Sequence, residues 1–166
     1  MMKKWIAFLL AILCVIGIYG CEQDQKNDGN DPPPYEFVNE GVTVTPGADA
    51  KPVLEALAAK KLQESAKGSC LGGVDGEDVR YVYSGFCIET FRTSTEEEIR
   101  WVVFTDDSVE TQRGIRVGST ADEVKAAYGS NNSETESLLR YQGGGTELRF
   151  TLRDGVVIGI EYTVAE

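Results

Sequence analysis

The chain ends in a segment whose side chains alternate between apolar and polar. From Leu148 to Arg153, every second residue is Leu or Phe, and the residues between them are Arg or Thr. A period of two is that of a β-strand with one buried face, because successive side chains point to opposite faces of a sheet. Asp154-Gly155 then provides a hairpin turn, and Val156–Tyr162 continues as a second strand. The pattern therefore predicts a half-buried hairpin.

Further strands are predicted where aromatic and β-branched residues gather between turn residues. The turns are Ser84-Gly85, Asp106-Asp107-Ser108 and Gly143-Gly144-Gly145. The glycine run follows a strand but opens no helix, so we interpret it as a turn and not as a phosphate-binding loop. The predicted strands are Tyr35–Val44 at an edge, Val79–Tyr83, Phe86–Phe91, Ile99–Thr105 and Leu138–Tyr141.

Two short helices are predicted before these groups of strands. The first follows Asp49 as its N-terminal cap, and its end is open between residues 59 and 67. The second is capped by Thr120 or Ser119, with Glu123 three residues after Thr120 as in a capping box, and it stops at Gly129.

The two helical segments match at an offset of 71 residues. Gly47 falls on Gly118 and Val53 falls on Val124. Each helix is followed by three strand-like segments, so we predict an α+β fold built as a tandem repeat of a helix plus a three-stranded antiparallel meander. The few identities leave chance similarity as an alternative.

The first 20 residues have the three-part layout of a secretory signal. Lys3 and Lys4 precede the uncharged run Trp5–Ile18, and Gly20 is a small residue at a cleavage position. The run is shorter than the about 20 apolar residues that a membrane-spanning helix needs. Residues 21–34 carry no large apolar side chain, so we expect a flexible linker there. Residues 35–166 then form one domain, with repeats at about 35–109 and 110–166.

The mature chain is strongly acidic and lacks histidine. Residues 1–20 contain two of the 16 basic residues and none of the 27 acidic ones, which leaves 14 basic and 27 acidic side chains. Such a charge disfavours nucleic-acid binding. The absence of histidine excludes histidine-based acid/base catalysis and histidine metal ligands, so we expect no catalytic residues, no metal and no cofactor.

Four cysteines occur in the chain. Cys14 lies in the signal, and Cys21 follows the cleavage position. Cys70 and Cys87 are then an even pair in an exported domain, for which a disulfide bond is the first expectation. Two free thiols are the alternative.

Acidic runs and strand aromatics are the remaining candidate site residues. Glu96-Glu97-Glu98 and Asp106-Asp107 have the ligand type of calcium, but such runs on loops are usually solvated. The aromatics are in part core residues and in part a candidate binding face, because Tyr and Trp are frequent in interfaces. The candidate binding face comprises Tyr81, Tyr83, Phe91 and Trp101.

Three parts of the chain resemble known families. Ile18-Tyr19-Gly20-Cys21 resembles a bacterial lipobox, which implies that a lipid is attached to Cys21 after cleavage and that the protein is anchored outside the cytoplasm. Gly114–Gly129 resembles a motif of β-lactamase inhibitor proteins and small outer-membrane assembly lipoproteins. The stretches Gly-Val-Thr-Val-Thr-Pro-Gly (41–47), Tyr-Ser-Gly-Phe-Cys-Ile-Glu-Thr (83–90) and Phe-Thr-Asp-Asp-Ser-Val (104–109) make residues 35–166 similar to a group of lipoproteins from gut Firmicutes. The resemblance implies helices on one face of a curved antiparallel sheet.

The function predicted from these features is that of a membrane-anchored, extracytoplasmic protein-binding module without enzymatic activity. Its membrane contact is the lipid on Cys21, and its protein partner is not specified by the sequence. The alternatives are a small carboxylate-dependent hydrolase and an inhibitor of a secreted enzyme.

Overall fold

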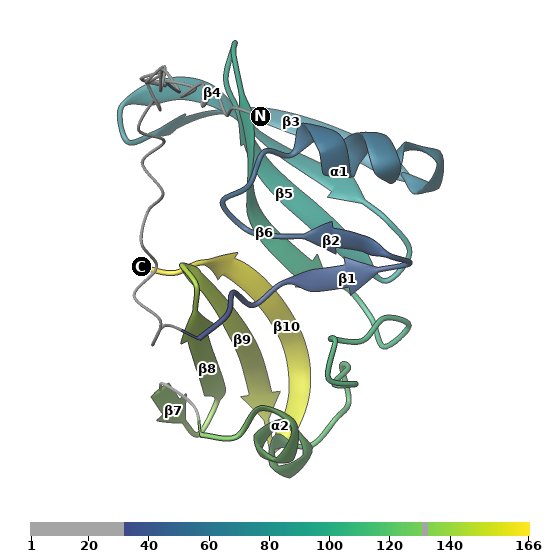
Figure 1. Ribbon diagram of the computed structural model, residues 1–166, viewed down its shortest axis with the longest axis vertical. Helices are drawn as coiled ribbons and strands as arrows, with labels where there is room; N and C mark the ends of the chain where they lie inside the picture. The colour runs from purple at the N-terminus through teal and green to yellow at the C-terminus, as the bar shows by residue number, and fades with distance from the viewer. Residues whose placement is uncertain (1–31, 131–132) are drawn as a thin grey trace, which may run out of the picture.

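The structure is a computed structural model that describes residues 32–130 and 133–166. Eight strands form one antiparallel sheet in the order β3-β4-β5-β6-β10-β9-β8-β7, and β1 and β2 form a separate two-stranded hairpin in front of it (Figure 1). The sheet strands are β3 (Gln63–Leu71), β4 (Val74–Val82), β5 (Phe86–Arg92), β6 (Glu97–Phe104), β7 (Ser133–Thr135), β8 (Leu138–Gly143), β9 (Thr146–Arg153) and β10 (Val156–Val164). The remaining elements are β1 (Phe37–Asn39), β2 (Val42–Val44), α1 (Lys51–Ala56), the 3-10 turn η1 (Ala58–Lys60) and α2 (Ala121–Tyr128).

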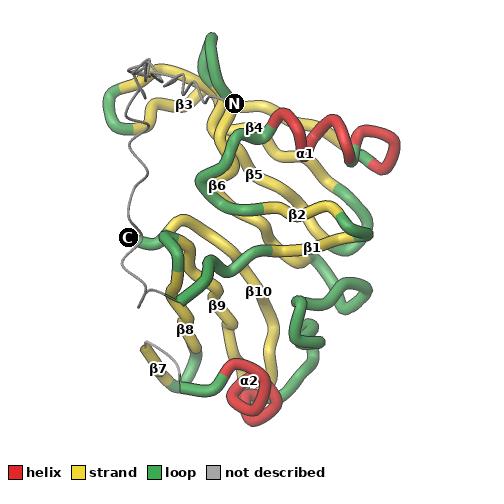
Figure 2. Tube along the Cα trace, in the orientation of Figure 1, coloured by secondary structure: helices red, strands yellow, loops and turns green. Residues whose placement is uncertain are grey.

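The predicted fold class is wrong. Among residues 32–130 and 133–166, strands make up 50% and helical residues 13%, in one eight-stranded antiparallel sheet with two helices, instead of an α+β repeat of a helix plus a three-stranded meander. Figure 2 shows how little of the trace is helical. The main cause is the strand β3 (Gln63–Leu71), since the sequence left its residues up to Lys67 open as a continuation of the first helix.

The loops that precede the two helices make equivalent hydrogen bonds at positions 71 residues apart. Before α1, the Gly47 N–H donates to the carbonyl of Ile99 (2.7 Å). Before α2, the Gly118 N–H donates to the carbonyl of Val157 (2.8 Å). Both glycines have positive φ angles, 87° and 95°, which residues with a Cβ rarely adopt. The loop before α1 is thus hydrogen-bonded to the start of β6, and the loop before α2 is hydrogen-bonded to the start of β10.

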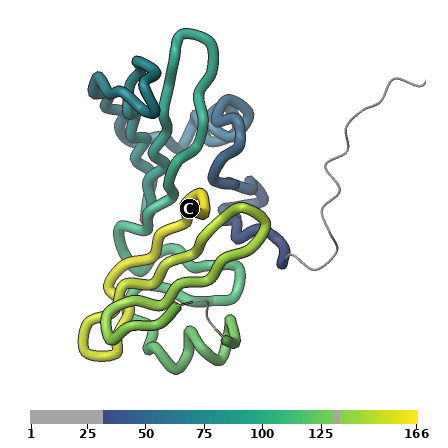
Figure 3. Tube along the Cα trace, turned by 90° about the vertical axis from the view of Figure 1, so that its left-hand side faces the viewer, coloured from purple at the N-terminus to yellow at the C-terminus, as the bar shows by residue number. Residues whose placement is uncertain are grey.

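The core lies between the sheet and the elements in front of it. Alternate strand residues face these elements and are buried, such as Ile88, Val102 and Tyr162, which are neighbours across β5, β6 and β10. We call this the inner face. Figure 3 shows α1 and the β1–β2 hairpin on this side of the sheet. The opposite, outer face carries Trp101 and Glu147.

The second helix confirms its predicted ends. The Thr120 hydroxyl accepts the N–H of Glu123, and the Glu123 carboxylate accepts the N–H of Thr120, which is a complete capping box. Gly129 is the C-cap, with φ 77°. Tyr128, in the last turn, packs against the rings of Tyr141 and Phe150 at centroid distances of 5.2 and 5.4 Å. This aromatic contact places α2 directly on β8 and β9.

The first helix is shorter than expected. Its N-cap residue is Ala50, which makes no side-chain hydrogen bond, although the Asp49 carboxylate accepts the N–H of Lys51 (3.0 Å). The helix ends at Ala56 and continues only as the 3-10 turn η1. Only Val53 within α1 is buried, so α1 holds to the sheet through fewer residues than a longer helix would.

The β8–β9 turn packs against the first residues of the domain. A Cβ on Gly144 would lie 2.5 Å from the backbone nitrogen of Pro34, and a Cβ on Gly143 would lie 2.7 Å from the carbonyl of Pro33. The next residue, Tyr35, donates its N–H to the hydroxyl of Thr146 (2.6 Å). The glycine run is therefore a turn, as predicted, and it also leaves room for the segment entering the domain.

The predicted disulfide bond is not formed, because both thiols are free: Cys70 is exposed and Cys87 is buried. Cys70 pairs with Asp75 across β3 and β4, and Cys87 pairs with Val82 across β4 and β5. Asp75 and Val82 are seven residues apart on one strand, which corresponds to about 23 Å at about 3.3 Å per residue. A disulfide bond needs Cα atoms within about 7 Å.

The predicted signal, the lipid attachment residue Cys21 and the linker up to residue 31 lie outside the described residues. Within residues 32–130 and 133–166, no helix has the length and apolar character needed to cross a membrane.

Candidate functional site

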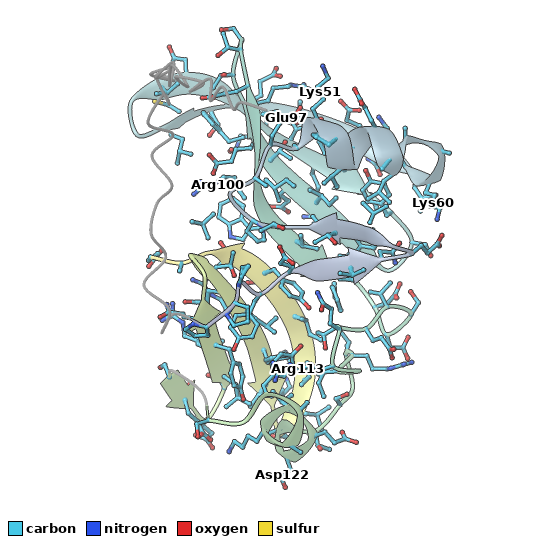
Figure 4. All side chains as sticks on the ribbon, viewed as in Figure 1. Lys51, Lys60, Glu97, Arg100, Arg113 and Asp122 are labelled. Carbon is cyan, nitrogen blue, oxygen red and sulfur yellow. The ribbon has the colours of Figure 1, made fainter. Side chains whose placement is uncertain are left out.

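A cleft of about 830 Å³ lies between α1 and the neighbouring ends of β3 to β6. One wall is α1, with Leu54 and Glu55, and the opposite wall is the sheet, with Tyr81 and Arg92. The loop after β5 and the start of β6 close one end through Glu97. Figure 4 shows Glu97 and Lys51 near the start of α1. The cleft is thus built from four strands and one helix.

A hydrogen-bonded group forms the floor of this cleft. Oε1 of Glu97 accepts the hydroxyl of Tyr81 (2.7 Å) and the hydroxyl of Thr90 (2.6 Å). Tyr81 and Thr90 are buried, so these bonds fix the position of the Glu97 carboxylate. Burial raises the pKa of Tyr81 well above its usual value, and the bond to Glu97 raises it further, so this hydroxyl stays a donor.

Arg92 links the floor to the rim of the cleft. Its guanidinium lies 3.4 Å from the Tyr81 hydroxyl, 2.9 Å from the Glu77 carboxylate and 3.6 Å from that of Glu64. Lys61 bonds the same Glu64 at 2.6 Å. The hydrogen bond from Lys61 holds the pKa of Glu64 below its usual value, and it outweighs the opposing effect of burial. These partly exposed ion pairs contribute little to stability, roughly 0–1 kcal/mol each.

Carboxylates outnumber cations around the cleft by six to three. The second oxygen of Glu97 has no hydrogen-bond donor among the described residues. Such an excess of negative charge in a concave site attracts cationic groups. The carboxylates are Asp49, Glu55, Glu64, Glu96, Glu97 and Glu98, and the cations are Lys51, Lys61 and Arg92.

The cleft exists in one half of the sheet because the two helices pack differently. Tyr128 lies at the end of α2 and fills the space above β8 and β9 with its ring. The residue at the same offset of 71 in the first half is Leu57, which is buried but has a smaller side chain. On β5, the inner-face series also changes from Phe86 and Ile88 to Thr90 and Arg92, so the sheet itself becomes polar beneath α1.

The four aromatics of the predicted binding face do not lie together on the surface. Tyr81, Tyr83 and Phe91 are buried at 4%, 3% and 7% exposure. Trp101 is exposed at 36% and lies on the outer face. Tyr81 is the member of the set that reaches the cleft, where it contributes its hydroxyl and not an exposed ring. A shared aromatic surface is therefore absent from this set.

The residues of the two acidic runs also lie in different parts of the structure. Glu97 is half-buried in the cleft, while Glu96 is exposed at its rim. Asp106 and Asp107 lie in the turn after β6, where Asp106 accepts the N–H of Ser108 (2.8 Å) and has a lowered pKa through its bonds to Ser108. Within the described residues, no group of three or more histidine, cysteine or carboxylate side chains is arranged to hold a metal ion.

A second polar cluster lies on the outer face around Glu147. This carboxylate is fully buried, although it lies on the face opposite the core. Arg140 binds both of its oxygens at 2.9 Å, Gln142 donates to Oε2 at 2.6 Å, and Arg149 donates to Oε1. Burial alone would raise the pKa of Glu147, but the hydrogen bonds from Arg140, Arg149 and Gln142 lower it overall. Both oxygens of the Glu147 carboxylate accept hydrogen bonds, so we interpret this cluster as one that stabilises the sheet.

Sequence reasoning missed most residues of the cleft. Glu64 lies on β3, whereas Thr90 and Arg92 lie together on β5, and none of them belongs to a recognisable motif. One signal was present, namely the change to Thr90 and Arg92 at inward positions of a strand that begins with Phe86 and Ile88. Polar residues at buried-face positions indicate a partner or a cavity there.

No protein-family model, curated protein or solved structure matches this chain.

Proposed function

We propose that this protein is a lipid-anchored, extracytoplasmic binding module that holds a cationic segment of a protein partner in the cleft beneath α1. The observation that carries the proposal is the fixed carboxylate of Glu97 on the floor of the cleft. Tyr81 and Thr90 occupy one of its oxygens, which leaves the other available to accept a hydrogen bond from a ligand. A preorganised acceptor of this kind binds without the entropic cost of ordering a flexible side chain.

The charge of the cleft supports a cationic ligand. The excess of six carboxylates over three cations lies on a chain whose formal net charge is −11. Long-range attraction of this sign accelerates association with basic partners and slows association with acidic ones. The exposed Glu55 and Glu96 at the rim then meet the approaching partner before it reaches Glu97.

The anchor belongs to the same proposal. A diacylated Cys21 would hold the protein on a membrane, because two acyl chains bind stably where one binds reversibly. Residues 21–34 would carry the cleft at a short distance from that membrane and raise its effective concentration there. Replacement of Cys21 by serine should release the protein from membranes. Unchanged membrane retention together with unchanged mass would refute the anchor.

A binding role fits the cleft better than a carboxylate-dependent hydrolase. Such a hydrolase needs one carboxyl group that stays protonated near neutral pH to act as an acid. The pKa of Glu64 is shifted in the opposite direction, because the hydrogen bond from Lys61 lowers it. Inhibition of a secreted enzyme is a special case of the binding role, in which the cationic segment belongs to the enzyme.

The test is affinity capture from detergent-solubilised membranes with quantitative mass spectrometry. The cleft variant carries Glu55→Lys and Glu96→Lys, and the matched control carries Asp107→Lys and Asp122→Lys, which change the net charge equally at exposed sites outside the cleft. We expect a partner that the wild type and the control retain and that the cleft variant loses at least about tenfold, or about 1.4 kcal/mol. Equal loss in both variants, or no specific partner, would refute the proposal.

A further inference from the structure

One edge of the eight-stranded sheet is left open along a full-length strand. β3 is the first strand of the sheet, and among the described residues nothing pairs with its other edge. Its pairing with β4 runs without a register shift from Gln63 opposite Val82 to Leu71 opposite Val74. Eight of its nine residues are exposed, with Ser69 the exception. β3 thus presents a continuous row of backbone N–H and C=O groups that no described strand pairs with.

This edge lacks most of the usual protection against strand pairing. Natural sheets protect edges by shortening the strand, inserting a bulge or proline, placing charged side chains on the strand, or covering it with another element. The opposite edge of this sheet follows that rule, because β7 has only three residues. β3 carries the charged residues Glu64 and Lys67, but it has nine residues, no proline and no bulge. The β3 edge is therefore longer and more regular for strand pairing than the β7 edge.

Hollows lie beside β3 on both faces of the sheet. On the inner face, Lys61 and Glu64 belong to the wall of the cleft described above. On the outer face, a hollow of about 310 Å³ is lined by Ser65 and Lys67 of β3 and extends to Trp101 on β6. Alternate side chains of a strand point to opposite faces, so a strand added beside β3 would direct its side chains to each hollow in turn.

We propose that β3 accepts an extended basic segment of another protein as a ninth strand of the sheet. In this mode of recognition, backbone hydrogen bonds provide affinity and alternate side-chain pockets provide specificity. The basic side chains point to the inner face, beside Glu64 of β3, and the intervening side chains point to the outer face, beside Ser65 and Lys67 of β3. The preference for basic side chains rests on the proposed function of the cleft, whereas the strand pairing rests on the edge alone.

The net charge of the chain favours another protein, and not a second copy of this chain, as the partner that pairs with β3. The formal net charge of −11 makes two copies repel each other, whereas a basic segment is attracted. The β4 residues next to β3 add to this effect, since Asp75 and Asp78 are exposed and have no salt-bridge partner among the described residues.

The experiment uses the full-length chain in detergent and a fluorescent peptide of sequence Lys-Thr-Lys-Val-Lys-Thr-Lys, followed by anisotropy. A control peptide carries N-methyl groups on two adjacent central residues, which keeps the charge but blocks backbone pairing on both edges. Adjacent strand N–H groups point to opposite edges, so one of Ser65→Pro and Ala66→Pro removes a donor from the free edge and the other disturbs the β4 ladder. The variant with the wild-type unfolding midpoint is the edge variant.

We expect saturable binding that falls at least about tenfold with the N-methylated peptide and with the edge variant. The cleft variant Glu55→Lys/Glu96→Lys should bind the basic peptide more weakly but still discriminate against N-methylation, which separates failure of the cleft from failure of the edge. Equal binding of both peptides, or no saturable binding, would overturn strand addition. A dimer in sedimentation that the edge variant abolishes would assign the edge to a second copy instead. If both proline variants unfold, the peptide comparison decides alone.

Discussion

Replacement of Glu147 by glutamine tests whether the outer-face cluster stabilises the sheet. The side chain keeps its size and loses its charge, so the three residues around it lose a shared anionic acceptor. These residues are Arg140, Arg149 and Gln142. Glu147 is fully buried, while the side chains of Arg140 and Arg149 are 30% and 25% exposed. The arginines can therefore regain part of their hydration in the variant.

The magnitude follows from this geometry. Breaking a fully buried ion pair costs about 3–5 kcal/mol, and breaking an exposed one costs about 0–1 kcal/mol. The Glu147 cluster lies between these limits, and we expect its loss to lower the free energy of unfolding by about 2–3 kcal/mol at pH 7. With a urea m-value of about 1.5 kcal/mol per molar, the unfolding midpoint falls by about 1–2 M.

The matched control is Glu89→Gln on the same outer face. Glu89 pairs with Arg80 at 2.8 Å, but the two side chains are 32% and 48% exposed. We expect this control to change the free energy of unfolding by less than about 1 kcal/mol. Urea unfolding followed by tryptophan fluorescence measures both variants, because Trp101 lies on the outer face and reports on the sheet.

The pH dependence provides an independent check. The pKa of Glu147 is lower in the folded protein than in the unfolded chain, so its contribution is complete above the unfolded pKa and is lost as the pH falls through the folded pKa. Wild type and Glu147→Gln should therefore differ at pH 7 and converge as the pH falls through this acidic window. A constant difference at all pH values, or a loss no larger than that of Glu89→Gln, would refute the reasoning.

Three further predictions concern the rest of the fold. Gly144→Ala should displace Pro34, because the backbone nitrogen of Pro34 would lie 2.5 Å from the new Cβ. We expect the free energy of unfolding to fall by about 1–3 kcal/mol and proteolysis at the start of the domain to become faster. An unchanged unfolding midpoint would contradict this contact. In the native, unreduced protein, the exposed Cys70 should react rapidly with a thiol reagent and the buried Cys87 only on unfolding, whereas no reaction of either would indicate a bond between them. Thr120→Ala removes the capping box of α2 and should cost about 1 kcal/mol, measured by chemical denaturation; a neutral effect would show that tertiary packing alone holds the helix.

The elements predicted correctly are those whose signal is local. The hairpin turn at Asp154-Gly155 forms with positive φ angles of 52° and 75°, as a turn of two such residues requires. Leu148, Phe150 and Leu152 are buried on the inner face, as their alternation predicts. These features depend on backbone preferences and on the period of two, and both can be seen within a few residues of sequence.

β3 shows why the fold class could not be predicted. Its sequence from Gln63 to Leu71 has no apolar alternation, because both of its faces are exposed. What makes it a strand is the continuous pairing with β4, whose own place is set by Tyr81 opposite Ile88 in the core. An edge strand of this kind takes its structure from its neighbour, so its own residues carry no signal for it.

The candidate site divides in the same way. The sequence by itself determined the acidic charge, the absence of histidine and the strands that carry Tyr81 and Thr90. Only the tertiary structure decided that these residues meet Glu97 beneath a short helix, and that Cys70 and Cys87 lie on strands too far apart in register to bond. The physical reason is that charge, turns and alternation act over a few residues. Strand register and the space left by α1 depend on how distant segments pack against one another.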